Sequence, residues 1–377
     1  MIMGIIPVWY GNQPTVPEKR ERRTEMCQGT YRKILGGVLA ALLALSLLTG
    51  CTCKPIDPTE EELAVVGTVG NYEITYDELR YVTLNCRADL ESRYGEGIFE
   101  NTESAAIYRP MLEADVQKKL ASDYYAVCAM ADEYYISKSE GMLGEKEILN
   151  KVQETVDATV EECGGKKDYI AALKENYMND RLFRFYTACD ECATELLYIL
   201  KTDLGLIPST DEEIDKILYS DKFIRTQHVF ILGRTEESRK TAELVRDTLK
   251  NSSDPESEIL ILKGKYDSDF TMTTVHGKYF GRFNTDYGEP YENAAFALRV
   301  GEVSDIVEGT DGSSDYLPGY FVILRMEPEK DWIEKNAKDF GDDIIGSEFN
   351  VMLRSYKDKL QFTFNEYGKT LDLLAVQ

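Results

Sequence analysis

The feature that most constrains the fold of this chain is a change of hydrophobic period at residue 222, which reverses at residue 329. From residue 76 up to this change, apolar side chains recur every three or four positions, as in amphipathic helices. Three later segments are rich in β-branched and aromatic residues, which favours strands: 222–232, 277–283 and 319–327. The pattern predicts an α+β chain, in which a small antiparallel sheet with flanking helices is inserted into a mainly helical domain.

Short local signals predict where individual elements begin and end. Gly70-Asn71 separates two alternating runs and predicts a hairpin turn. A threonine followed three residues later by a glutamate is a capping box, which predicts helices that begin after Thr75 and after Thr210. Apolar spacing and alternation predict four further elements: continuous helices over 108–134 and 166–200, a long helix after residue 328, and a strand at 360–366.

Composition and cysteine spacing exclude several classes of function. The 377 residues carry a formal net charge of −24, and nucleic-acid binding needs clustered Lys and Arg, so no nucleic-acid partner is predicted. Eight cysteines lack the even spacing of a disulfide framework. Cys189 and Cys192 form a CxxC on a predicted helix, but with two histidines and no second CxxC no metal site is predicted. Buried, unreactive thiols are favoured, while a disulfide and a redox or metal role remain alternatives.

The N-terminal region is predicted to direct export. Residues 34–48 form an apolar run behind two basic residues, too short for a comfortable membrane span but suited to a signal peptide. The sequence LTGC at 48–51 resembles the bacterial lipobox, whose cysteine carries a lipid. We therefore expect a lipoprotein signal peptide over 1–50, a lipid on Cys51 and a polar tether over 51–62. The protein would act on the extracytoplasmic face of the cell membrane; an uncleaved anchor is the alternative.

Four stretches between residues 223 and 327 share a pattern with one enzyme family. They are RTQHVFI at 225–231, KYFGR at 278–282, YENAAFALRVGEVSDIV at 291–307 and GYFVILR at 319–325. In these stretches the segment resembles the parvulin family of peptidyl-prolyl cis–trans isomerases, whose members open with R-x-x-H-I-L-V and continue with F-x-x-A-A-F-A-L-x-x-G-E-V-S-x-x-V. The resemblance implies a parvulin-like α+β domain over residues 222–328.

The flanking regions resemble the SurA and PrsA foldases, chiefly in architecture. The stretch VGTVGNYEITYDEL at 66–79 is similar to the N-terminal start of those proteins, and KLQFTFNEYGKTL at 359–371 fits their returning C-terminal strand. This resemblance implies a helical chaperone domain over 63–221, completed by a helix and a strand from 329–377.

The resemblance to parvulins also implies a slot for a prolyl ring. Its lining would be aromatic: Phe280, Tyr287 and Tyr291, with Phe296 packing beneath. Family members more often have Met and Phe where the two tyrosines stand. Packing in the domain core is the alternative role for these rings.

A polar cluster beside the slot is the second part of the implied site. Parvulins pair two histidines on neighbouring strands with a Cys or Asp nearby. His228 matches the first histidine, and Phe321 stands where the second is expected. Asp267 or Asp269 is the candidate carboxylate. A purely structural histidine on a strand is the alternative for His228.

Two functions follow from the resemblance. The first is a foldase that isomerises X–Pro bonds in unfolded or partly folded exported polypeptides, a reaction that needs no cofactor, because only rotation about a partial double bond is catalysed. The second is a holdase chaperone whose degenerate parvulin domain only binds peptide.

Overall fold

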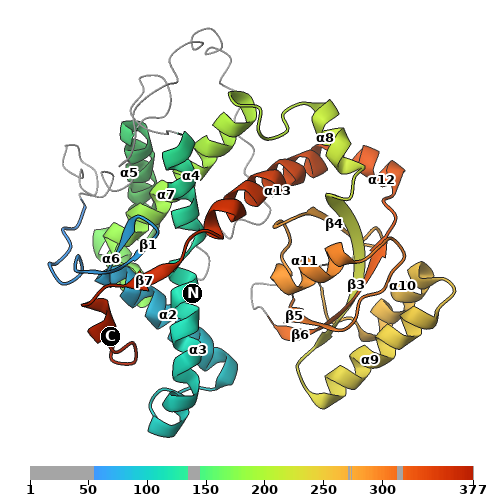
Figure 1. Ribbon diagram of the computed structural model, residues 1–377, viewed down its shortest axis with the longest axis horizontal. Helices are drawn as coiled ribbons and strands as arrows, with labels where there is room; N and C mark the ends of the chain where they lie inside the picture. Colours follow the sequence, from blue (N-terminus) through green and yellow to red (C-terminus); the bar gives the residue numbers. More distant parts are fainter. Residues whose placement is uncertain (1–54, 135–144, 271, 273, 312–316, 377) are drawn as a thin grey trace. The chain divides into compact units, whose positions relative to one another are not determined.

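The structure is a computed structural model that describes residues 55–134, 145–270, 272, 274–311 and 317–376 (Figure 1). These residues divide into two compact units. The central unit comprises residues 204–351, and the terminal unit comprises 55–203 together with 352–376. The predicted signal peptide and Cys51 lie outside the described residues. Among the residues described, no helix is both long and apolar enough to cross a membrane.

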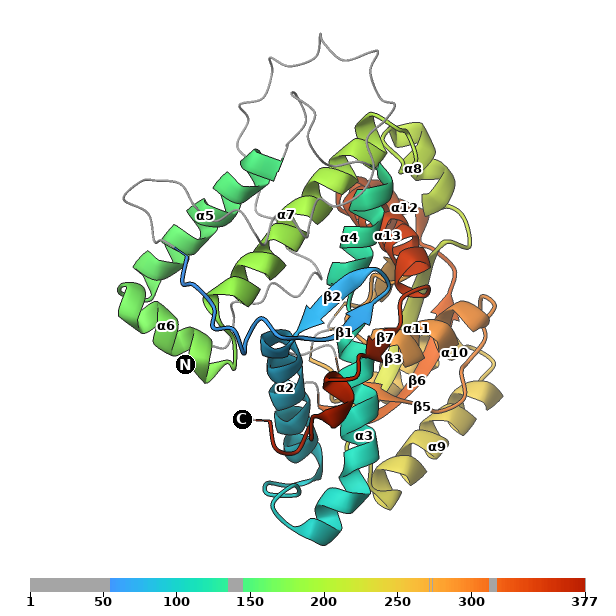
Figure 2. The same ribbon diagram turned by 60° about the vertical axis from the view of Figure 1, so that its left-hand side comes forward.

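The terminal unit is built mainly from helices, with one three-stranded antiparallel sheet. Its elements are β1 (Val65–Val69), β2 (Tyr72–Thr75), α2 (Tyr76–Tyr94), α3 (Thr102–Leu120), α4 (Asp123–Tyr134), α5 (Glu145–Glu162), α6 (Lys166–Glu175), α7 (Asp180–Thr202), β7 (Phe362–Phe364) and the 3-10 turn Gly368–Thr370. Helices α4 and α5 both pack on α7 (Figure 2). The sheet order is β2-β1-β7, so β1 pairs with a strand from the far end of the chain, Gly67 opposite Phe364. Both segments of the terminal unit therefore contribute to one sheet.

Several predicted elements of the terminal unit differ in the structure. Helix α2 begins after Thr75 as expected, but the predicted capping box is wrong, because the Thr75 side chain makes no capping bond to the helix. The continuous helix predicted over 108–134 breaks at Ala121 into α3 and α4. The helix predicted over 166–200 also breaks, because Tyr177 has a φ of 59°. Helix α7 then begins after Asn179, whose side chain accepts a hydrogen bond from the Leu182 amide. Apolar spacing survives such breaks, so it did not reveal them.

Two buried carboxylates stand at the start of α2. Asp77 accepts hydrogen bonds from Arg181 at 2.6 Å, from Nε to one oxygen and from Nη2 to the other. Glu78 Oε2 accepts the Tyr125 hydroxyl at 2.6 Å. Burial raises the pKa of Glu78 from 4.5 to about 7, against the opposing effects of Tyr125 and Arg181. The terminal unit thus holds a carboxyl group that is protonated in part at neutral pH.

We expect Glu78→Gln to remove a pH dependence from the stability of the terminal unit. Because the folded-state pKa is raised, the contribution of Glu78 is fully present below pH 4.5 and is lost as the pH rises through 7. Between pH 4.5 and 7, the free energy of unfolding of the wild type should fall by about 3 kcal/mol relative to that of the variant. Urea unfolding at pH 4, 6 and 8 measures this, with the exposed Glu96→Gln as control. Equal pH profiles for wild type and Glu78→Gln would contradict the prediction.

The central unit contains a four-stranded antiparallel sheet with helices on both faces. Its elements are α8 (Asp211–Leu218), β3 (Phe223–Leu232), α9 (Glu236–Asn251), α10 (Pro255–Tyr266), β4 (Lys278–Gly281), α11 (Gly288–Ala297), β5 (Val307–Thr310), β6 (Pro318–Met326), α12 (Lys330–Lys335) and α13 (Ala337–Lys357), the last of which continues beyond residue 351. The capping box of Thr210 and Glu213 forms as predicted. The single long helix expected after residue 328 is wrong, since it breaks at Asn336 into α12 and α13. Helix α10 and strand β5 were not expected from the sequence.

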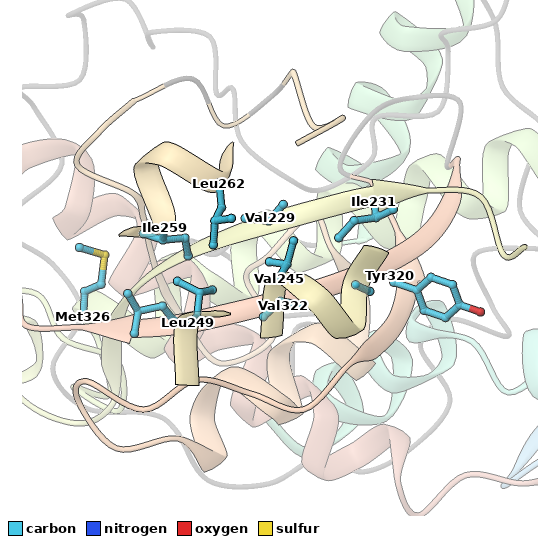
Figure 3. Close-up of a cluster of buried hydrophobic side chains, with 11 residues drawn as sticks. Val229, Ile231, Val245, Leu249, Ile259, Leu262, Tyr320, Val322 and Met326 are labelled. Carbon is cyan, nitrogen blue, oxygen red and sulfur yellow. The ribbon is translucent and has the colours of Figure 1, made fainter. Parts of the chain in front are cut away.

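The sheet order is β4-β3-β6-β5, and side chains alternate between its two faces. On one face, Val229 lies opposite Val322 and Ile231 opposite Tyr320, and these pack with Val245 of α9 and with α10 (Figure 3). Each buried aliphatic side chain of this kind contributes about 1.5–3 kcal/mol relative to an exposed one. This apolar layer anchors β3 and β6, so that their other face is held in a defined register.

Candidate functional site

The opposite face of the sheet carries most of the predicted site residues. Thr226, His228 and Phe230 alternate along β3 and point to this face, because side chains two apart on a strand share a side. On β6, Phe321 is the direct partner of Phe230. Helix α11 covers them with Tyr291. The strand register and one helix thus bring together residues that are far apart in the sequence.

A chain of hydrogen bonds runs through this cluster around the fully buried His228. Its Nε2 lies 2.9 Å from Asp269 Oδ2, and its Nδ1 lies 3.1 Å from the Tyr291 hydroxyl. The Tyr291 hydroxyl is in turn 2.9 Å from Thr226 Oγ1. The Tyr287 hydroxyl donates to the same Asp269 oxygen at 2.8 Å. Both ring nitrogens of His228 and its carboxylate partner are therefore engaged within the protein.

These contacts assign the protonation state of His228. An ionised Asp269 only accepts hydrogen bonds, so Nε2 carries the proton and Nδ1 accepts from Tyr291. Burial lowers the pKa of His228 below 6.5, although the hydrogen bond to Asp269 acts in the opposite direction. The imidazole is neutral at physiological pH. Because the unfolded chain binds this proton more readily, His228 makes the fold less stable as the pH falls below 6.5.

The structure distinguishes the two candidate carboxylates. Asp269 contacts His228, whereas Asp267 lies immediately after α10 and accepts the Phe230 backbone N–H at 2.8 Å. Asp267 also receives Lys263 Nζ at 2.6 Å, one turn earlier on α10. Asp267 therefore fastens the segment after α10 to β3, and this contact helps to position Asp269 under the imidazole.

Aromatic rings surround the hydrogen-bond chain. The His228 ring lies 4.7 Å from Tyr287, 5.4 Å from Tyr291 and 5.0 Å from Phe321, measured between ring centroids, all edge to face. Phe280 stands 6.1 Å from Tyr291. These rings are 3% exposed or less, so the cluster is closed to solvent as it stands.

Phe296 lies at the edge of the cluster rather than among the rings that touch His228. Its ring meets Phe280 edge to face at 5.7 Å, and the Arg282 guanidinium lies 4.0 Å above it. Phe296 is partly buried. Phe296 therefore packs against the cluster from its edge, through Phe280.

Four residues of the site were missed in the sequence: Thr226, Phe230, Lys263 and Met272. Thr226 and Phe230 could have been found, because they lie two positions either side of His228 and share its face. Lys263 lies four residues before Asp267, which is the spacing of a helical ion pair. Met272 is buried among the same rings, and no local signal points to it.

His276, the other histidine of the chain, is not part of the His228 cluster. His276 stacks on Trp332 at 3.7 Å between centroids, and its Nδ1 lies 2.5 Å from Glu329. It takes no part in the hydrogen bonds of His228. In the described part of the chain, no group of three or more His, Cys, Asp and Glu side chains could hold a metal ion. The polar groups at His228 are its neutral imidazole, the Asp269 carboxylate and the phenols of Tyr287 and Tyr291, in an apolar enclosure.

No family model matches the chain, and no curated protein matches it. Among solved structures, it is similar to the foldase protein PrsA from Streptococcus pneumoniae, at 15% identity over 67% of this chain and 86% of that chain, with a TM-score of 0.28. It is similar to PrsA from Bacillus subtilis, at 20% identity over 82% of this chain and 94% of that chain, with a TM-score of 0.23. A SurA-like chaperone from Campylobacter jejuni matches at 15% identity over 78% of this chain and 94% of that chain, with a TM-score of 0.22. The chain is thus similar to the PrsA and SurA-like proteins that its sequence resembles.

Proposed function

We propose that this protein is an extracytoplasmic foldase, held at the cell membrane by a lipid on Cys51. A parvulin-like domain, residues 222–328 of the central unit, catalyses peptidyl-prolyl cis–trans isomerisation in exported polypeptides, and the helical terminal unit binds their unfolded segments. The observation that carries the proposal is the buried chain Asp269–His228–Tyr291, enclosed by aromatic rings. Such a site offers apolar surface for the prolyl ring and a few fixed polar groups for the amide that rotates.

The chemistry follows from the barrier to rotation, which is about 18–20 kcal/mol for a planar peptide bond. A catalyst lowers this barrier by binding the twisted amide better than either planar form. In the twisted form the bond has lost resonance and charge separation, so a dry site stabilises it relative to water. Phe280, Tyr287 and Tyr291 would grip the prolyl ring, while neutral His228, oriented by Asp269, keeps the polar groups in place.

A holdase that binds peptides without catalysis is the second candidate. The observation that favours it is the closed state of the cluster: Phe280, Tyr291 and Phe321 are no more than 1% exposed. A prolyl ring enters only if these side chains move, which adds an energetic cost to catalysis. The replacement of the second parvulin histidine by Phe321 points in the same direction.

The two candidates are separated by assays on residues 54–377. Exchange NMR on X–Pro peptides measures isomerisation directly, and the foldase predicts a rate above the uncatalysed one. Suppression of aggregation of an unfolded test protein measures chaperone binding. An uncatalysed exchange rate together with full suppression of aggregation would replace the foldase with the holdase.

We expect Phe321→His to raise the isomerisation rate severalfold, because it restores the histidine pair of the parvulins. Residue 321 already stands 5.0 Å from the His228 ring, so a new imidazole would join the polar cluster. The measurement is peptide exchange NMR at pH 7.5. Phe321→Leu is the control, since it keeps the position apolar, and thermal melting verifies folding of both variants. A folded Phe321→His with unchanged rate would show that position 321 does not serve the reaction.

A further inference from the structure

Two buried thiols face each other in the terminal unit, far from the His228 cluster in sequence and in a different unit. Cys128 on α4 and Cys189 on α7 are both fully buried, and their sulfurs are 4.0 Å apart. Helices α4 and α7 pack along each other at this point. The function proposed above uses neither residue. We propose that Cys128 and Cys189 form a disulfide that ties α4 to α7 in the exported protein.

The geometry favours this pair over the CxxC pair. A disulfide holds its sulfurs at about 2.05 Å, so Cys128 and Cys189 need to approach by about 2 Å, which side-chain rotation and a small helix shift supply. Cys189 and Cys192 are both inside the regular helix α7. Side chains three apart on a helix have Cβ atoms about 5–6 Å apart, beyond the Cβ separation of about 3.5–4.5 Å that a disulfide accepts. A Cys189–Cys192 bond would therefore unwind a turn of α7.

The other described cysteines do not compete in the folded chain. All five described cysteines are free thiols, but the 4.0 Å contact between sulfurs joins Cys128 to Cys189, not to Cys86 on α2 or to Cys163 after α5. The Cys128–Cys189 bond closes a segment of 61 residues. A cross-link over that length removes much conformational freedom from the unfolded chain, which is the way disulfides chiefly stabilise proteins.

The reaction is a thiol–disulfide exchange with an external disulfide as oxidant. The thiolate of one cysteine attacks the external disulfide, giving a mixed disulfide and releasing one thiol. The second cysteine then attacks the mixed disulfide, which forms the Cys128–Cys189 bond and releases the second thiol. Two electrons pass to the external disulfide, and the two protons leave with the released thiols. An oxidising extracytoplasmic compartment supplies such disulfides.

Burial also sets when the bond forms. Cys128 and Cys189 are both fully buried, out of reach of an external disulfide, and burial raises the pKa of the Cys189 thiol well above its usual value. Since only the thiolate reacts, the folded, reduced protein should oxidise slowly. The bond is expected to form during folding, while the thiols are still open to the solvent.

The test is a count and a map of thiols in residues 54–377, which contain five cysteines. The reduced chain is refolded from urea in a buffer of oxidised and reduced glutathione, then alkylated and digested for mass spectrometry. We expect two of the five thiols to be lost, one cross-link between the peptides of Cys128 and Cys189, and a melting temperature several degrees above that of the reduced protein. Chain that is already folded should oxidise at least about tenfold more slowly, as thiolate-limited chemistry requires.

Serine variants separate the possible outcomes. In Cys128→Ser and in Cys189→Ser every remaining thiol should stay free, whereas Cys192→Ser should still lose two thiols to the Cys128–Cys189 disulfide. Five free thiols after refolding, or a Cys189–Cys192 cross-link, would refute the proposal. The proposal rests on the proposed function only for the extracytoplasmic location that supplies the oxidant, and none of these readouts depends on isomerase activity, so failure of one is distinguishable from failure of the other. The same map on the full-length chain recovered from cell membranes tests whether the bond forms after export.

Discussion

Arg181→Met is expected to lower the free energy of unfolding of the terminal unit by about 3–5 kcal/mol, because it leaves a buried charge without its partner. The Asp77 side chain is 3% exposed and that of Arg181 is 11% exposed. The guanidinium contacts both Asp77 oxygens and also donates to Thr75 Oγ1 at 2.6 Å. The buried Glu78 lies next to this pair. Without the guanidinium, the buried Asp77 side chain keeps only the neutral donors Thr75, Asn179 and the Glu78 N–H.

Urea unfolding followed by far-UV circular dichroism measures this loss. Trp332 of the central unit is the only tryptophan in residues 54–377, so its fluorescence follows the other unit separately. Arg93→Met is the matched control, because Arg93 pairs with Asp89 on α2 with side chains 46% and 47% exposed. Exposed pairs contribute about 0–1 kcal/mol. A loss for Arg181→Met no larger than that of the control would show that Asp77 is well solvated.

Asp269→Asn is expected to reduce isomerisation about tenfold, equivalent to about 1.4 kcal/mol of transition-state stabilisation. The carboxylate accepts from both His228 and Tyr287, and its charge orients the neutral imidazole. Asparagine keeps the shape and one acceptor but removes the charge, and charge-assisted hydrogen bonds are roughly twice as strong as neutral ones. The effect therefore falls on the electrostatics of the site more than on its packing.

Asp267→Asn is the control, two residues away in the same segment. It keeps the Oδ1 acceptor for the Phe230 N–H, which holds the segment on β3, and weakens only the ion pair of Oδ2 with Lys263, so the isomerisation rate should change little. A second readout is the nitrogen NMR signal of the His228 imidazole, easily assigned because the chain has two histidines. That signal should move in Asp269→Asn and stay in place in Asp267→Asn. Equal effects of the two substitutions on rate and signal would remove the special role assigned to Asp269.

Local patterns predicted much of the architecture. The β-branched and aromatic residues at 222–232 and 319–327 mark β3 and β6, because a strand buried on both faces needs such side chains throughout. Turn and capping chemistry placed the hairpin at Gly70 and the start of α8 at Thr210. The breaks at Ala121 and Asn336 were missed, since apolar residues continue on both sides of each break.

The sequence by itself determined which residues are suited to the site: a strand histidine, a group of aromatic side chains and two nearby carboxylates. Only the tertiary structure decided their roles, because Asp267 and Asp269 are two residues apart and their contacts depend on how the segment after α10 meets β3. The 4.0 Å approach of the Cys128 and Cys189 sulfurs likewise depends on the packing of α4 on α7. Hydrophobic period is a local property that the order of residues encodes directly, whereas a contact between distant residues exists only after the chain has packed.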